Sequence, residues 1–199
     1  MKKQKTYVLI ISEYFPAKHP RAGQPTGFEE KIKNALDSAD QNMSCMECKE
    51  KWWGDCKTCA AGGHFPRKEE KLHTIRENYE LWKRRIDEVN TGNAVLSVRK
   101  WSGKPRQSKQ VELFRFDKDS GIGVQKLQWI CARIETAIIS PSINDNCMFE
   151  AIAPGESLYN TREICRNDGL SEQDFRDWFK NYDLTTPKAI IHFTPKFRY

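Results

Sequence analysis

The chain has 199 residues, of which 38% are apolar and 30% charged, and it includes 6 Trp and 10 Phe residues. This length suits one folded unit with insertions, and the number of large apolar side chains excludes a globally disordered chain. The net charge is +6. No apolar stretch approaches the length of a membrane span or of a secretory signal, so we expect a cytoplasmic protein that makes no contact with the membrane.

The positive charge is concentrated in the middle of the chain. Residues 67–115 carry 13 Lys and Arg against 7 Asp and Glu, whereas the segments on either side are close to balance. Such a segment is typical of proteins that bind a polyanion. A solvated helix face with counter-ions would carry the same charges. The pattern therefore favours RNA or a nucleotide as partner and leaves that alternative open.

The N-terminal part of the chain predicts a strand, a loop and a helix. Residues 7–12 form a β-branched run typical of a buried strand. Residues 13–27 contain three prolines and exclude regular structure. This long loop either lines a binding cleft or crosses the surface. Thr26 and Glu29 then form a capping box before a short amphipathic helix at residues 28–36.

Residues 40–66 form a polar insertion with two Cys-x2-Cys pairs. The four thiols are those of Cys45, Cys48, Cys56 and Cys59. Each short turn can place two thiolates on one tetrahedral metal, so the spacing predicts a compact zinc knuckle. A four-thiolate site has no open position, and we expect its Zn²⁺ to be structural. Disulfides and reduced free thiols are the alternatives, and disulfides are disfavoured in a chain without an export signal.

The remaining sequence predicts two more helices and four strands. Apolar residues at helical spacing indicate a helix at residues 77–91, and Ser171 caps another that extends to residue 182. Runs rich in Val, Ile and aromatic residues predict strands at 94–101, 111–116, 124–134 and 189–193. A basic hairpin loop at 102–109 joins the first two. We therefore expect an α+β fold with a curved, mostly antiparallel sheet and about three flanking helices.

Residues 70–76, with the sequence Glu-Lys-Leu-His-Thr-Ile-Arg, carry the strongest functional signal. On an extended segment, neighbouring positions can offer the ammonium of Lys71, the hydroxyl of Thr74 and the guanidinium of Arg76 to one cleft. Arg76 can clamp a phosphate, and other cations near Lys71 would lower its pKa toward that of a base. Alternatively, Lys71 and Arg76 pair with the neighbouring glutamates on the surface.

This segment resembles the signature of the ASCH family, a branch of the PUA-like β-barrels. Lys71, Thr74 and Arg76 match the lysine, threonine and arginine of that signature. The order of strands and helices around the motif is also similar. The resemblance implies a single PUA-like barrel domain over residues 1–199. The loop at 13–27, the zinc-knuckle-like insertion at 40–66 and the helix after the motif depart from the minimal family.

The resemblance implies two functions. ASCH domains are associated with RNA binding, and some small members hydrolyse N4-acetylcytidine with the motif lysine and threonine and a glutamate before the late helix. Here Lys71 and Thr74 are the corresponding catalytic candidates, whereas Arg166 aligns with the glutamate, and Asp168 or Glu163 replaces it only after a shift in register. RNA or nucleotide binding is therefore the favoured reading, and the amidohydrolase is the alternative.

The candidate binding surface extends from the motif to the basic hairpin. Its residues are Lys71, His73, Thr74, Arg76, Trp101, Lys104, Arg106 and Lys109. Trp101 would either stack on a base or close the end of the barrel. His192, on the last predicted strand, is expected to be a core or rim histidine rather than a catalytic one.

Overall fold

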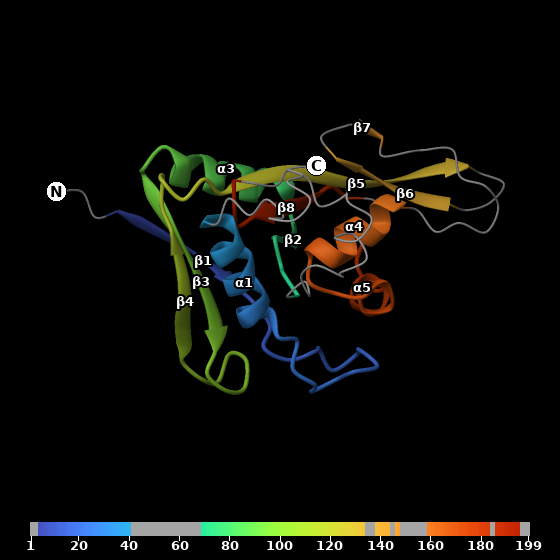
Figure 1. Cartoon of the computed structure of the whole chain (residues 1–199), viewed down its shortest axis with the longest axis horizontal. Coiled ribbons are helices and arrows are strands. Elements are labelled where there is room, and N and C mark those ends of the chain that lie inside the picture. The colour runs from blue at the N-terminus through green and yellow to red at the C-terminus, as the bar shows by residue number, and fades with distance from the viewer. Residues whose placement is uncertain are drawn as a thin grey trace, which may run out of the picture.

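The computed structural model describes residues 4–40, 69–133, 138–143, 146–147, 159–183 and 186–195. In these residues the fold is α+β, as predicted, with two small sheets and four helices (Figure 1). The sequence predicted one curved sheet, but the strands are divided between two. No strand pairing among the residues named above joins the sheets or closes either one into a barrel.

The first sheet has the strand order β1-β3-β4. β1 (Lys5–Ile10) lies parallel to β3 (Ala94–Trp101), which requires a long connection between them, and helices α1 and α3 lie in that connection. β3 and β4 (Gln110–Phe116) form an antiparallel hairpin. The basic loop between them is exposed, as predicted, and begins with a 2.9 Å hydrogen bond from Ser102 N to Lys109 O.

The second sheet has the order β2-β8-β5-β6-β7, and every pairing in it is antiparallel. Its strands are β2 (His73–Glu77), β5 (Gly123–Arg133), β6 (Ile138–Ile143), β7 (Asn146–Cys147) and β8 (Lys188–His192). β8 lies between β2 and β5, and all its residues are buried. The last strand of the chain is therefore central, and the motif strand β2 is hydrogen-bonded directly to it.

Helix α3 (Tyr79–Asn90) contacts strands of both sheets, namely β3, β5 and β8. Trp82, Ile86 and Val89 are buried on the face that the spacing predicted. Asn78 caps the helix by accepting a 3.1 Å hydrogen bond from Leu81 N. The helix thus links the two sheets through one apolar core.

The described part of the chain has three further helices. α1 (Phe28–Asp40) buries Phe28, Ile32 and Ala35, and α5 (Glu172–Phe179) begins at the predicted cap, Ser171. α4 (Tyr159–Asn167) was not predicted, because its sequence carries few apolar residues. In the described part of the chain, no helix has the length and apolar character needed to cross a membrane.

The predicted zinc ligands, Cys45, Cys48, Cys56 and Cys59, lie outside the described residues. Cys165, on α4, is a free and buried thiol. Burial raises the pKa of this thiol to about 12, so it stays protonated at neutral pH.

The turn between α4 and α5 holds a segment of the motif in place. Gly169 has a φ of +75°, Leu170 N donates to Cys165 O, and Gly169 N donates to Arg166 O. This is the Schellman arrangement, which needs a residue in the left-handed region. Just before the turn, Asn167 O accepts a 2.8 Å hydrogen bond from Leu72 N. The turn is therefore fixed against the chain next to Lys71.

We predict that Gly169→Ala destabilises the protein more than Gly23→Ala. Both glycines have φ near +75° and would each cost about 1–2 kcal/mol in backbone strain. A Cβ at Gly169 would lie 3.1 Å from Lys71 Cβ, whereas one at Gly23 meets nothing within 4 Å. We expect about 1–2 kcal/mol more destabilisation at Gly169, measured by urea unfolding. Equal losses would show that the turn yields without disturbing Lys71.

Candidate functional site

A cleft of about 410 Å³ lies where β1 ends, between the start of α1, strand β2 and helix α5. Lys71, Thr74, Arg76 and Asp168 are polar residues of its lining. The aromatic part of its wall comprises Phe28, Trp82, Trp178, Phe179 and Tyr182. The structure therefore brings three of the motif residues to one cavity, together with a carboxylate from the α4–α5 turn.

Lys71 is buried with only 1% of its surface exposed, and its ammonium is paired with Asp168. Lys71 Nζ lies 2.8 Å from Asp168 Oδ1 and also donates to Asp168 O. It lies 4.1 Å from the centre of the Phe28 ring, a cation–π contact. Burial lowers the pKa of Lys71 to about 8 despite the carboxylate. A substantial fraction of this amine is therefore neutral near pH 8.

Asp168, which the sequence offered only after a shift in register, is the buried carboxylate of this cleft. It is 4% exposed, and burial raises its pKa above the usual value, while the charges of Lys71 and Arg76 oppose the rise. Arg166, which the resemblance put at the glutamate position, is exposed and is not part of the cleft lining, and Glu163 is also absent from it. The Asp168-Gly169 pair is the sequence feature that could have indicated this carboxylate. Gly169 ends α4, and Asp168 just before it contacts Lys71 of the motif.

Arg76 is held in one orientation by neutral oxygens. Its Nη1 donates to Thr74 Oγ1 at 2.9 Å and to Ile75 O at 2.8 Å, and its Nη2 donates to Ile10 O at 2.6 Å. Burial lowers the pKa of this guanidinium. The hydroxyl of Thr74 is thereby oriented as well, because its oxygen accepts a hydrogen bond from Arg76.

His73 lies behind the cleft and does not line it. Its ring is fully buried, with Nδ1 3.6 Å from Asp168 Oδ1, and it packs edge-on against His192 at 5.7 Å. Burial, His192 and Lys71 hold the pKa of His73 well below its usual value. The prediction that His73 contacts a ligand directly therefore does not fit this geometry, whereas His192 is a buried core residue, as predicted.

The remaining predicted binding residues lie apart from the cleft. Trp101 is not among the lining residues, and neither are Lys104, Arg106 and Lys109, which are exposed in the β3–β4 loop. The cations of the motif and those of the β3–β4 loop are close in sequence but lie apart in space, because β3 leads the chain away from the motif. The alternative of simple surface pairs also fails for Lys71, since its partner is the buried Asp168.

The long loop at residues 13–27 supports the cleft from outside and contributes none of its lining. His19 donates from Nε2 to Asp174 O at 3.1 Å and accepts from Arg21 N at 3.1 Å. Arg21 Nη1 lies 2.7 Å from Asp174 Oδ2. The His19 ring stacks on Phe15, whose centroid lies 5.7 Å from that of Trp178. These contacts hold the loop against α5, next to Trp178 of the cleft lining.

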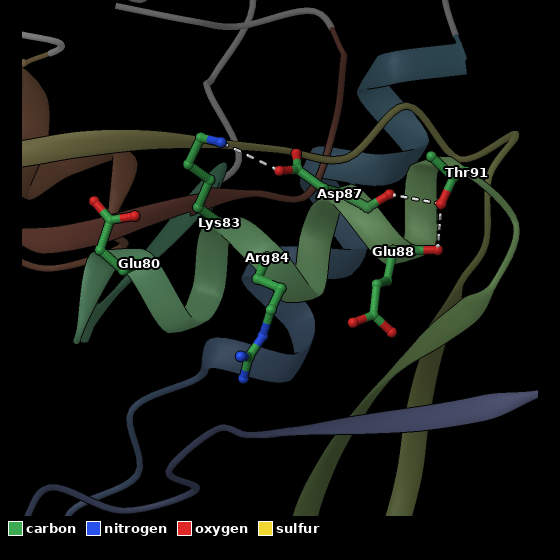
Figure 2. A pocket seen from close by; sticks show the side chains of 6 residues that line it. All are labelled: Glu80, Lys83, Arg84, Asp87, Glu88 and Thr91. Atoms are coloured by element: carbon green, nitrogen blue, oxygen red, sulfur yellow. Dashed lines mark hydrogen bonds and ion pairs between the residues drawn. The ribbon is translucent and has the colours of Figure 1, made fainter.

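A second hollow, of about 280 Å³, lies on the outer face of α3 (Figure 2). Three of its five charged groups are paired. Lys83 Nζ lies 3.3 Å from Asp87 Oδ2, and Glu88 Oε2 accepts from Tyr7 and Lys5. Most of the charge in this hollow is therefore already compensated. In the described ranges, no group of metal-ligating side chains was found that could hold an ion.

We predict that burial of the Lys71–Asp168 pair makes the free energy of unfolding increase at alkaline pH. Below about pH 8, Lys71 is protonated in both the folded and the unfolded chain. Between about 8 and 10.5, only the unfolded chain keeps the proton, so the free energy of unfolding increases with pH, by about 2–3 kcal/mol. Urea unfolding from pH 7.5 to 10.5 should show this rise. It should be absent from the double variant Lys71→Met/Asp168→Asn, and parallel curves for the two proteins would contradict it.

Comparisons with known proteins returned no relative: no family model, curated protein or solved structure matches the chain. The chemistry of the cleft therefore carries the functional assignment. Three groups define that chemistry, namely an ion-paired lysine, a fixed arginine and a threonine hydroxyl.

Proposed function

We propose that the cleft binds a single nucleotide, either free or as part of RNA, in the manner of a PUA-like ASCH domain. The observation that carries this proposal is the meeting of Lys71, Thr74 and Arg76 with an aromatic wall in one cavity of about 410 Å³. That volume suits a small ligand and is typical of specific binding pockets. It is too small for a folded RNA, so one unstacked base would enter.

The wall chemistry supports a planar ligand. Aromatic rings stack on bases with little regard to sequence, and polar groups at the end of the cavity read their edges. Tyr182 is 40% exposed at the rim, and Trp178 is backed by the loop at 13–27. The Thr74 hydroxyl, which lines the same cavity, would meet the polar edge of such a ligand.

The finer fold assignment is part of the same proposal. A strand, a helix, the motif, further strands, a late helix and a final apolar strand follow one another as in a PUA-like domain. The exposed cations of the β3–β4 loop would add attraction for an RNA backbone outside the cleft. An experimental structure of the whole chain would test the barrel, because the described strands form two separate sheets.

We predict that Tyr182→Ala weakens binding of a short single-stranded RNA by about tenfold, through the loss of one stacking surface. Tyr14→Ala is the matched control, since Tyr14 is 53% exposed and lies outside the cleft lining. Fluorescence anisotropy at 50 mM and 300 mM salt would measure both variants. Failure of the parent protein to bind any oligonucleotide or nucleotide at low salt would overturn the proposed function.

A second candidate function is hydrolysis of an N-acylated nucleoside, and the contact between Lys71 and Asp168 favours it. Neutral Lys71 would accept a proton as water or the Thr74 hydroxyl attacks the amide carbonyl. Asp168, whose raised pKa suits proton exchange, would help return the proton to the leaving amine. One water is consumed, either as the attacking group or in a second step that hydrolyses the acyl ester formed on Thr74. The products are the nucleoside with its free amine and a carboxylic acid.

We predict for this candidate that Asp168→Asn lowers N4-acetylcytidine turnover at least about 100-fold, as loss of a catalytic acid or base does. Arg166→Gln should leave the rate unchanged, because Arg166 is exposed and outside the cleft. Release of cytidine, followed by chromatography, should increase as pH rises through about 8 in the parent protein. Absence of turnover in the parent would exclude hydrolysis of this substrate and leave nucleotide binding as the function.

A further inference from the structure

The buried charges of the cleft are unequal in number. Two cations, Lys71 and Arg76, line it, and Asp168 supplies the buried carboxylate of the lining. Glu77 also belongs to the lining, but its side chain is 62% exposed and its nearest cation is Lys188, at 3.9 Å. Glu77 is also absent from the groups whose charge acts on the Arg76 pKa, whereas Asp168 is among them.

The carboxylate of Asp168 is paired with Lys71 rather than with Arg76. Their charged atoms lie 2.8 Å apart, and Lys71 also bonds to the main-chain oxygen of Asp168. In the part of the chain that the structure describes, no carboxylate oxygen lies within 4.0 Å of the Arg76 guanidinium. One carboxylate therefore serves two cations, and Arg76 is the cation left without close compensation.

The donors of Arg76 are also incompletely used. Three hydrogen bonds go to Thr74 Oγ1, Ile75 O and Ile10 O, all of them neutral acceptors. A guanidinium has five N–H donors, so Nε–H and one Nη2–H have no acceptor among the described residues. A partly buried guanidinium without an anionic partner is costly. An anion brought by a ligand would remove that cost.

We propose that the nucleotide enters the cleft with a phosphate against Arg76, so that the site selects phosphorylated nucleotides over neutral nucleosides. This inference rests on the proposed function and deepens it. Arg76 is pre-oriented by its three bonds to neutral oxygens, so binding a phosphate requires little further ordering of the side chain. Lys71 is unsuited to the same task, because its ammonium is already engaged by Asp168.

The test is calorimetric titration of the whole chain with the four nucleosides and their 5′-monophosphates. We expect the preferred monophosphate to bind about tenfold more tightly than its nucleoside, as a charge-assisted pair would allow. Arg76→Gln should reduce this ratio toward one. Lys118→Gln should keep it, because Lys118 is an exposed cation outside both the cleft lining and the basic β3–β4 loop. Inorganic phosphate and a trinucleotide distinguish a free anion from a phosphate within RNA.

The outcomes separate this inference from the function on which it rests. If nucleoside and monophosphate bind the parent protein equally well, the phosphate subsite is wrong and nucleotide recognition stands. If neither binds and the trinucleotide also fails, both are overturned. The comparison of ligands uses only the parent chain, so it decides the question even if Arg76→Gln does not fold.

Discussion

Burying the ammonium of Lys71 requires a carboxylate at a fixed position, and that requirement joins segments far apart in the chain. Lys71 N donates to Lys31 O of α1 at 3.0 Å, and Lys31 Nζ in turn donates to Gly169 O at 2.9 Å. Leu72 O accepts a 3.0 Å hydrogen bond from Phe193 N, just after β8. Helix α1, the α4–α5 turn and the end of the central strand therefore converge on two motif residues.

The buried Lys71–Asp168 pair at this point lowers the stability of the fold and supplies reactive groups to the cleft. Desolvation outweighs the attraction within the pair, because burial lowers the pKa of Lys71 and raises that of Asp168. Each shift favours the neutral form of its group. Well-packed apolar residues would make a more stable interior here, so the retained pair is typical of sites where protons or charged ligands are handled.

Local patterns predicted the elements better than their assembly. The spacing in α3, the cap at Ser171 and the β3–β4 hairpin agree with the structure because they depend on near neighbours. β6 contains Pro141, which weakens a strand signal, and α4 is too polar to stand out. The parallel β1–β3 pair and the place of Asp168 depend on distant contacts. The motif predicted the cleft cations, and only the fold showed which carboxylate meets them.

The loop at residues 13–27 stiffens a wall that it does not form. The rings of Phe15 and His19 pack against that of Trp178, and Arg21 forms an ion pair with Asp174 on the same helix. A ligand therefore meets a ring that is already immobilised, and little side-chain entropy is lost when it stacks. Ligand affinity in this protein is accordingly set in part by residues that no ligand touches. Substitutions in the loop at residues 13–27 would change that affinity even where every residue of the cleft lining stays the same.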